Sequence, residues 1–169
     1  DKDYELILID NMHSERYCSL FNLPGRLSYT FIEADLRKIE LSKLLCQVDL
    51  VIHLAAITNA ERSILKPNEV LDNNYKCTKV VSEYCTNNKI PIVFISSTSV
   101  YGTSKKLVSE DSHEVDLKPQ SPYAESKYKE EKLLLEKKKD GLKYIILRFG
   151  TIFGISPGMR FHTAVNKFC

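Results

Sequence analysis

A tyrosine and a lysine, Tyr123 and Lys127, stand four residues apart at the start of the charged segment SPYAESKYKEEKLLLEK. Four residues make about one helical turn, so both side chains would share a helix face. Free tyrosine has a pKa of about 10, and an adjacent cation can lower that value by roughly 1 to 3 units. Such a phenol could take a proton from a substrate hydroxyl while hydride leaves the carbon. Isolated pairs of this kind are also common on helix surfaces.

Four hydroxyl residues follow the apolar run PIVFI, and Tyr101 and Gly102 then turn the chain. A hydroxyl at the end of a strand can hydrogen-bond a substrate oxygen during proton transfer. The same hydroxyls could instead only satisfy a turn. The run does not select among its members, which are Ser96, Ser97, Thr98 and Ser99.

Two acidic residues close other apolar runs. Asp10 could accept both hydroxyls of an adenosine ribose and repel the extra phosphate of NADP, or it could form a turn with Asn11. Asp35 could face an adenine edge, or it could cap a helix. Near the end of a third run, Ala55 and Ala56 would let a flat or phosphorylated ligand approach the backbone, while His53 is interpreted as a packed core histidine.

Short runs rich in Ile, Val, Phe and Leu predict buried parallel strands at 5–10, 29–35, 48–56, 91–97 and 143–151. Amphipathic stretches between several of them predict helices at 39–46, 68–87 and 122–139. This alternation predicts an α/β fold with a doubly wound parallel, Rossmann-like sheet, incomplete at both ends. Ligands of that fold bind beyond the carboxyl ends of the strands, where the residues above fall.

The glycine-rich turn that holds a pyrophosphate in this fold would lie about 20 residues before an acid such as Asp10. Only nine residues precede Asp10, and none of them is glycine. We therefore expect the chain to be a piece of a longer protein that lacks the first strand and the phosphate loop. Such a piece alone should bind NAD poorly, because the helix N-terminus that would face the pyrophosphate is missing.

The composition, with 43% hydrophobic and 27% charged residues, is that of one soluble domain. Lys and Glu alternate most densely at 127–139, which favours a solvated helix face over a nucleic-acid patch. The apolar runs are too short to span a membrane and no signal peptide begins the chain, so we expect a cytoplasmic protein. Five cysteines without CxxC spacing predict reduced, packed thiols, and scattered histidines predict no metal site.

The motifs also occur in a characteristic order: IDN, EADL, HLAA, LDNNYKCT, SSTSVYG, SPYAESK and LRFGTIFG. This series, which covers nearly the whole chain, resembles the extended short-chain dehydrogenase/reductase family and specifically its NAD-dependent epimerase/dehydratase branch. The stretch ERSILKPNEVLDNNY is similar to UDP-galactose 4-epimerase. The resemblance implies NAD as cofactor, a nucleotide sugar as substrate, and a homodimer through the helices around 68–87 and 122–139.

The resemblance also implies site residues. Tyr123 would be the catalytic acid/base, Lys127 would lower its pKa and bind the nicotinamide ribose, and Ser97, four residues before Tyr101, would polarise the substrate. Residues implied to bind the adenosine, to bind the central part of the cofactor or to brace its site are Asp10, Asn11, Asp35, Leu36, Leu54, Ala55, Ala56, Thr58, Asn74 and Phe149, besides Tyr123 and Lys127. The substrate would meet Ser97, Thr98, Ser99, Tyr123 and Thr151, with Met159, Arg160 and Phe161 nearby.

The implied activity is that of an NAD-dependent nucleotide-sugar epimerase that transiently oxidises a sugar hydroxyl. Alternatives are a reductase or dehydratase of the same family, or a non-catalytic nucleotide-binding member. Dehydration loses weight because Thr98 and Ser99 stand where dehydratases usually carry Asp-Glu, while Gly150 and Thr151 replace an Asn-containing 4-epimerase pattern. We expect residues 1–154 to form the NAD-binding core and residues 155–169 to begin a substrate-binding region.

Overall fold

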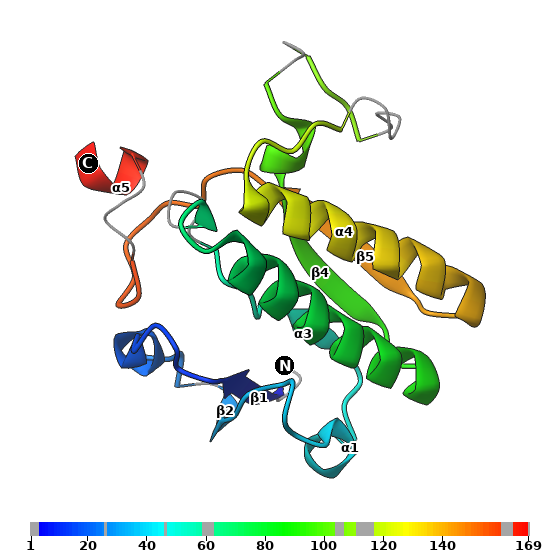
Figure 1. Cartoon of the computed structure of the whole chain (residues 1–169). Coiled ribbons are helices and arrows are strands. Elements are labelled where there is room, and N and C mark those ends of the chain that lie inside the picture. The colour runs from blue at the N-terminus through cyan, green and yellow to red at the C-terminus, as the bar shows by residue number, and fades with distance from the viewer. Residues whose placement is uncertain are drawn as a thin grey trace. The chain divides into compact units, whose positions relative to one another are not determined.

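The computed structural model describes residues 4–25, 27–45, 47–58, 63–103, 107–110, 117–159 and 164–168. These residues form two compact units, shown in Figure 1. The first unit combines residues 1–39 with residues 151–169, and the second comprises residues 40–150. The predicted division of the chain near residue 154 into a cofactor core and a substrate region remains a prediction.

The first unit contains two parallel strands, β1 (Glu5–Asp10) and β2 (Ser28–Glu33). Their register pairs Asp10 with Glu33, so both carboxylates follow the strands to the same edge. A short 3-10 helix, η1 (Tyr17–Leu20), lies between the strands in the sequence, and α5 (Ala164–Phe168) comes near the end of the chain. The Arg16 guanidinium donates hydrogen bonds to the carbonyls of Gly158 and Met159, which ties the returning chain to this unit.

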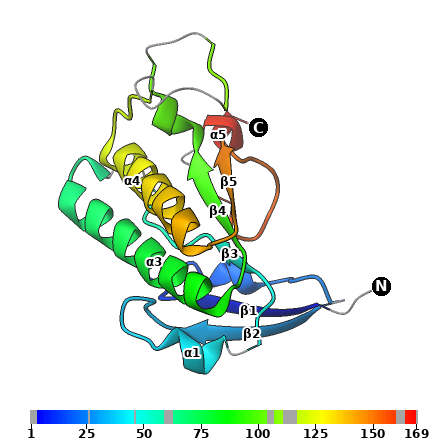
Figure 2. The same ribbon diagram turned by 90° about the vertical axis from the view of Figure 1, so that its right-hand side faces the viewer.

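The second unit is built on a parallel sheet in the order β3 (Val51–His53), β4 (Ile92–Ser97) and β5 (Tyr144–Phe149). Its long helices are α3 (Pro67–Asn88) and α4 (Pro122–Lys137), which lie side by side in both ribbon views (Figures 1 and 2). The shorter elements are α1 (Leu41–Leu44), η2 (Thr98–Tyr101) and η4 (Lys138–Asp140).

Local sequence signals begin and end the two long helices. The Ser121 side chain accepts a hydrogen bond of 3.1 Å from the Ala124 N–H, and Pro122 follows in the first turn of α4. Pro67 likewise begins α3, which ends at Lys89 in the left-handed conformation with φ 58°. These caps fix where α4 starts, and so place Tyr123 in its first turn.

Gly102 ends η2 with φ 67°, a conformation that favours glycine. A Cβ atom at this position would lie 2.1 Å from the backbone oxygen of Lys118. A larger residue at position 102 would therefore displace the chain that leads into α4. The glycine keeps the loop after β4 close to the start of that helix.

The expected elements are confirmed, with strand and helix ends that differ by a few residues. The prediction of a parallel, Rossmann-like α/β fold is also confirmed, with the pairing β1–β2 in the first unit and β3–β4–β5 in the second. The expectation that the strands are buried is wrong for β1, β2 and β5, which contain no buried residue. Within β4, Ile92, Phe94 and Ser96 are buried while the residues between them are half-buried. The side of the sheet that meets α4 therefore carries the core of the second unit.

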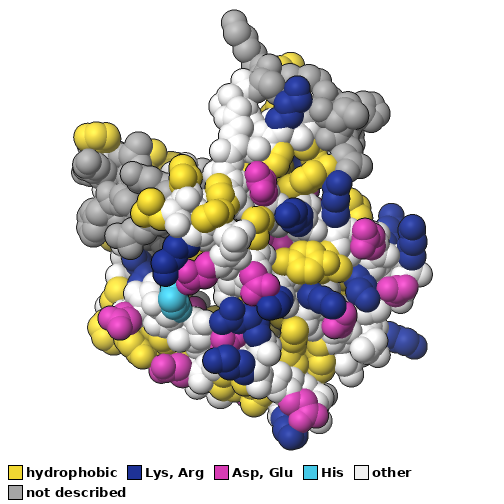
Figure 3. Space-filling model, in the orientation of Figure 1, with side chains coloured by type: hydrophobic (Ala, Val, Ile, Leu, Met, Phe, Trp, Pro, Cys, Tyr) yellow, Lys and Arg dark blue, Asp and Glu magenta, His cyan; other side chains and the backbone are white. Residues whose placement is uncertain are grey.

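The expectation that residues 127–139 form a solvated face is wrong for three of them. Glu130 has no exposed surface, and Lys127 and Glu131 are each 3% exposed. They are buried because α4 packs against α3 and β4, and each charge meets an opposite charge there. The view in Figure 3 shows lysines, acids and apolar side chains interspersed over the outer side of α3 and α4.

Within the described part of the chain, no helix combines the length and the apolar character that crossing a bilayer requires. Of the predicted packed thiols, Cys77 and Cys85 are buried and Cys18 is half-buried. Cys46 and Cys169 lie outside the described residues.

Candidate active site

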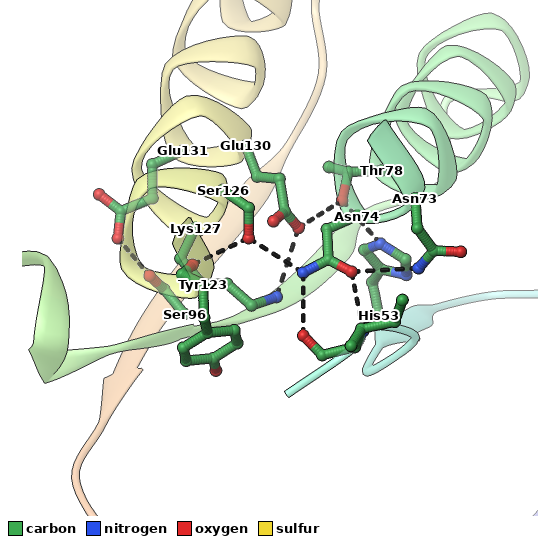
Figure 4. Close-up of polar contacts among 11 residues, drawn as sticks. His53, Asn73, Asn74, Thr78, Ser96, Tyr123, Ser126, Lys127, Glu130 and Glu131 are labelled. Carbon is green, nitrogen blue, oxygen red and sulfur yellow. Dashed lines mark hydrogen bonds and ion pairs between the residues drawn. The ribbon is translucent and has the colours of Figure 1, made fainter. Parts of the chain in front are cut away.

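Tyr123 and Lys127 occupy the first two turns of α4, and Figure 4 shows both side chains extending from the same side of that helix. Tyr123 is half-buried. Lys127 is buried, and its Nζ lies 3.3 Å from Glu130 Oε2 and 4.6 Å from the centre of the Phe94 ring. An ammonium over an aromatic face and beside a carboxylate is held on both sides. The lysine is thus fixed by packing rather than free to move in solvent.

The loop after β3 is fastened by Asn74 of α3, which is fully buried. Its Oδ1 accepts the Ile57 N–H at 2.7 Å and its Nδ2 donates to the Ile57 carbonyl at 3.1 Å. The same Nδ2 donates to Ser126 Oγ at 2.9 Å, and Ser126 is the residue before Lys127. Asn74 therefore joins the loop that carries Ala55, Ala56 and Thr58 to the helix that carries Tyr123 and Lys127.

The hydroxyl residues after β4 separate into different environments. Ser96 is buried and donates a hydrogen bond to Glu131 Oε1, because alternate residues of a strand face opposite sides. Ser97 is half-buried, and its Oγ accepts from the Ser99 N–H at 3.2 Å and from Ser99 Oγ at 2.9 Å. Thr98 is exposed. This arrangement removes Ser96 as a candidate and keeps Ser97 and Ser99 together at the strand end.

A second ion pair joins buried Glu131 to the half-buried Arg148. Arg148 of β5 donates two hydrogen bonds to the Glu131 carboxylate, from Nε at 3.0 Å and from Nη2 at 2.7 Å. Its Nη1 also donates to the Tyr101 hydroxyl at 3.0 Å. The hydrogen bonds to Glu131 raise the pKa of Arg148, so it is charged at every ordinary pH. This network holds β4, β5 and α4 in place around the candidate site.

Glu130 belongs to a different network, drawn in Figure 4. Its Oε2 accepts from Thr78 Oγ1 at 2.7 Å, and Thr78 Oγ1 lies 2.9 Å from His53 Nε2. Burial raises the pKa of Glu130, while Lys127 and the Thr78 hydroxyl oppose that change. Burial and, secondarily, the Lys127 charge lower the pKa of His53 to about 3. His53 is 3% exposed, which confirms its interpretation as a core histidine.

Sequence reasoning missed Glu130, Glu131, Thr78 and Arg148, which all contribute to this cluster. For the two acids the signal was helical spacing: Glu130 and Glu131 follow Lys127 by three and four residues, which places them near it on α4. Thr78 and Arg148 lie on α3 and β5, and no spacing along α4 points to them. The charge alternation was interpreted as a wet surface because a buried acid cannot be distinguished from an exposed one without its partner.

The first unit carries the residues predicted to bind adenosine. Asp10 Oδ1 accepts the Met12 N–H at 2.7 Å, and Asn11 Oδ1 accepts the His13 N–H at 3.1 Å, so the turn interpretation of this pair is confirmed. Both residues are exposed. Asp35 does not cap a helix, because α1 begins only at Leu41 with Glu40 before it. It binds Arg37 at 2.6 Å instead, and that hydrogen bonding lowers the pKa of Asp35 to about 2.

An open hollow in the first unit collects several of these side chains beside the ends of β1 and β2. It is lined by Asn11, His13, Glu33, Ala34, Asp35, Arg37 and Lys38. Asn11 and Asp35, which were predicted to contact ribose and adenine, therefore do share one surface. Leu36 is half-buried and does not belong to the lining. Among the described residues, no cluster of three or more metal-ligating side chains occurs.

The remaining predicted residues lie after β3, at the last position of β5 and beyond it. Leu54 is 66% exposed and Phe149 is 40% exposed. Thr151 is exposed, and Met159 is half-buried. Arg160 and Phe161 lie outside the described residues. The structure thus brings together Asn74, Lys127 and the Ala55–Thr58 loop in the second unit, and Asn11 and Asp35 in the first.

A family model, that of the NAD dependent epimerase/dehydratase family, matches residues 1–169. The chain belongs to this family. The resemblance seen in the order of motifs is therefore confirmed, and the family is one of enzymes.

The relatives of this chain include proteins named as epimerases and proteins named as dehydratases. It is 33% identical over 177 residues to the uncharacterized UDP-glucose epimerase YtcB of Bacillus subtilis, an alignment that covers 99% of this chain and 55% of the relative. It is 29% identical to the dTDP-D-glucose 4,6-dehydratase of Dictyostelium discoideum, covering 90% of this chain and 39% of the relative. The chain spans about half the length, or less, of the curated relatives it matches.

Among solved structures, the chain is similar to UDP-glucuronic acid 4-epimerase from Bacillus cereus in complex with UDP-glucuronic acid and NAD. The TM-score is 0.82 at 30% sequence identity, and the match covers 96% of this chain and 53% of that one. This similarity supports the family assignment at the level of the fold.

Proposed function

We propose that the protein is an NAD-dependent nucleotide-sugar epimerase, with Tyr123 as acid/base, Lys127 as its cationic partner and Ser97 as the hydroxyl that orients the substrate oxygen. The observation that carries the proposal is the fixed Lys127 ammonium, which is 3% exposed and lies one helical turn after Tyr123 on the same side of α4. A buried cation stabilises a neighbouring phenolate far more than an exposed one, because water does not screen it.

Three features of the chain suit NAD. The hollow of the first unit offers the amide of Asn11 and the carboxylate of Asp35, and exposed Asp10 lies next to Asn11 at the end of β1. Such acceptors match the hydroxyl and amino groups of adenosine. Arg37 also lines the hollow, but its guanidinium is bound to Asp35, so a phosphate would have to compete with that carboxylate. The residues therefore fit NAD better than NADP.

The chain's own residues would act on the substrate as follows. Tyr123 takes the proton of a sugar hydroxyl, and Ser97 donates a hydrogen bond to the same oxygen. Lys127 stabilises the phenolate before the transfer and binds ribose hydroxyls of the cofactor. NAD, when bound, supplies a reversible hydride acceptor. After the oxidised sugar has presented its other face, Tyr123 returns the proton to the oxygen, so no cofactor is consumed.

Two other activities would use the same residues. A nucleotide-sugar or carbonyl reductase would release oxidised cofactor, and it would consume one NAD(P)H for each product molecule. A dehydratase needs an acid and a base beside the polarising hydroxyl, where this chain has Thr98 and Ser99. Hydroxyls with ordinary pKa values serve poorly in both roles, which favours epimerisation. A non-catalytic nucleotide-binding protein would need neither Tyr123 nor Lys127.

The test is Tyr123→Phe in the full-length protein, assayed with UDP-glucose and UDP-glucuronic acid. We expect a loss of activity of about 10²- to 10⁴-fold, the range typical of removing a general acid/base. Tyr128→Phe is the matched control, since Tyr128 is a half-buried tyrosine on the same helix whose ring lies 4.6 Å from Lys132 Nζ. Unchanged activity in Tyr123→Phe on every nucleotide sugar tried would refute the catalytic proposal.

We also propose that the outer side of α3 and α4 forms a homodimer interface. Tyr75 of α3 and Leu135 of α4 are large apolar side chains with exposures of 38% and 52%. Charged and apolar side chains are interspersed over the outer side of these helices (Figure 3). Sedimentation velocity of the full-length protein tests this proposal. A dimer that Leu135→Glu converts to a monomer supports it, and a monomeric wild-type protein contradicts it.

A further inference from the structure

Glu130 is a buried carboxylate for which the proposed reaction has no role. It has no exposed surface, and its charged partner is Lys127, whose Nζ lies 3.3 Å from Oε2. The other carboxylate oxygen, Oε1, has no hydrogen-bond partner among the described residues. A buried charge that is only partly hydrogen-bonded costs stability. Its position therefore calls for a reason other than packing.

The hydrogen bonds around Glu130 all converge on one oxygen. Thr78 has a single hydroxyl proton, which it donates to Glu130 Oε2, so its oxygen accepts the proton of His53 Nε2. The lowered pKa of His53, about 3, keeps that imidazole neutral. The hydrogen bond from Thr78 to Glu130, and not the pKa, assigns the remaining proton to Nε2. Lys127 donates to the same Oε2 from the other side. This arrangement is complete when Glu130 is ionised and Lys127 is an ammonium.

Among the described residues, no other charge from the elements packed against Lys127 competes for it. The buried residues of α3 include no acid or base, only Cys77 and Cys85 as titratable groups. Those of β4 are Ile92, Phe94 and Ser96. The Arg148 side chain of β5 is occupied by Glu131, and β3 contributes neutral His53. Within the described part of the chain, Glu130 is consequently the counter-charge that Lys127 meets.

We propose that Glu130 is a positioning residue that holds the Lys127 ammonium on the buried side of α4 and offsets part of its positive field at Tyr123. The phenol then ionises at a higher pH than Lys127 alone would set. This inference rests on the proposed function only in that Tyr123 is the group whose ionisation matters.

The size of the effect follows from the helix geometry. Glu130 lies seven residues after Tyr123, which is about 10 Å along an α-helix. One unit charge at that distance, in surroundings of effective dielectric constant about 20, changes an ionisation by roughly 1 pH unit. Relaxation and water reduce this, so the expected change is about 0.5 to 1 pH unit. Burial raises the pKa of Glu130, while the Lys127 charge and the Thr78 hydrogen bond favour its ionised form.

The experiment is a direct titration of Tyr123 in the full-length protein. Tyrosine labelled with ¹³C at Cζ gives a separate NMR signal for each ring, and Tyr123→Phe identifies the signal of Tyr123. In Glu130→Gln we expect its titration midpoint to move to lower pH by about 0.5 to 1 unit. Glu125→Gln is the matched control, because Glu125 is an exposed acid on the same helix and closer in sequence to Tyr123. In Glu125→Gln the titration midpoint of Tyr123 should move by less than about 0.2 unit.

Glu130→Leu provides a second variant, since it removes the same charge without a new polar group. It must move the Tyr123 midpoint in the same direction as Glu130→Gln. An unchanged midpoint in the variant that folds, or a movement to higher pH, overturns the inference.

Failure of the inference and failure of the proposed function remain distinguishable. If Tyr123→Phe abolishes activity but the titration midpoint of Tyr123 is unchanged in the Glu130 variants, only the inference fails. If the midpoint moves while Tyr123→Phe keeps full activity, the electrostatic role of Glu130 stands and the proposed catalytic function fails. If the proposed function and the inference are both correct, the acid side of the pH–activity profile shifts to lower pH in Glu130→Gln. A purely structural role would lower activity without that shift.

Discussion

Glu130 and Glu131 are neighbours on α4, both are buried, and each pairs with a cation, yet their surroundings differ. Glu131 receives two hydrogen bonds from Arg148 and one from Ser96, and it joins three elements of the second unit. Glu130 receives its bonds on one oxygen and pairs with Lys127 on its own helix. The Glu131 carboxylate, hydrogen-bonded on both oxygens, organises the fold. The Glu130 carboxylate, hydrogen-bonded on one oxygen, is suited to adjusting the electrostatic field of the candidate catalytic lysine, Lys127.

The largest effect should come from breaking the Glu131 pair. Glu131→Leu leaves the Arg148 guanidinium, whose side chain is 20% exposed, without its carboxylate. We expect the free energy of unfolding to fall by about 4 kcal/mol, as when one member of a buried pair is removed. Urea denaturation measures the change. If Glu131→Leu lowers the free energy of unfolding by less than about 1 kcal/mol, the Glu131 network does not organise the fold as described.

His53 makes the Glu130 network sensitive to acid. Because its pKa is lowered from 6.5 to about 3, the folded protein excludes a proton that the unfolded chain binds. Its contribution to stability is present above pH 6.5 and is lost as the pH falls from 6.5 towards 3. Between pH 6.5 and 4 the loss is about 3 kcal/mol. In His53→Gln this part of the slope should disappear, and parallel stability curves for variant and wild type would contradict the assignment.

Replacing both members of each pair sharpens the comparison further. Lys127→Met with Glu130→Leu should leave the unfolding free energy within about 1 kcal/mol of wild type. His53 can move its proton to Nδ1 in this variant, and the Thr78 hydroxyl can then donate to Nε2. Arg148→Met with Glu131→Leu should cost about 2 kcal/mol, since Ser96 and Tyr101 lose their partners. Thermal denaturation of the two double variants provides the test. An equal loss of unfolding free energy in the two double variants would show that the Lys127–Glu130 and Arg148–Glu131 pairs do not differ.

The smallest effect is expected where an ion pair is exposed. Asp72 and Lys76 on α3 approach to 2.8 Å, but their side chains are 55% and 57% exposed. Lys76→Ala should change the unfolding free energy by less than about 0.5 kcal/mol, and 1 M NaCl should erase the difference. A larger effect would show that burial is not what separates the pairs on α4 from surface pairs.

Sequence patterns were informative about strands and about spacing. The apolar runs predicted the five strands found among the described residues, but the buried positions they implied occur in β4 and at His53 of β3 and not in β1, β2 or β5. Tyr123 and Lys127 were predicted to share a face because helical geometry requires it. The fate of Glu130 and Glu131 could not be predicted in the same way. The burial of Glu130 depends on Thr78 and His53, and that of Glu131 on Arg148; these residues are distant in the sequence and come close only in the folded chain.

The central claim, transient oxidation of a sugar hydroxyl with Tyr123 as acid/base, is tested most directly by an isotope. UDP-glucose that carries deuterium at C4 is incubated with the full-length protein, and the epimer formed is examined by mass spectrometry and NMR. The proposal predicts that the deuterium stays at C4 of the epimer, because hydride is held within the active site and returned to the same molecule, and that Tyr123→Phe forms no epimer. Deuterium found in the solvent or in released NADH, or an equally active Tyr123→Phe variant, would contradict it.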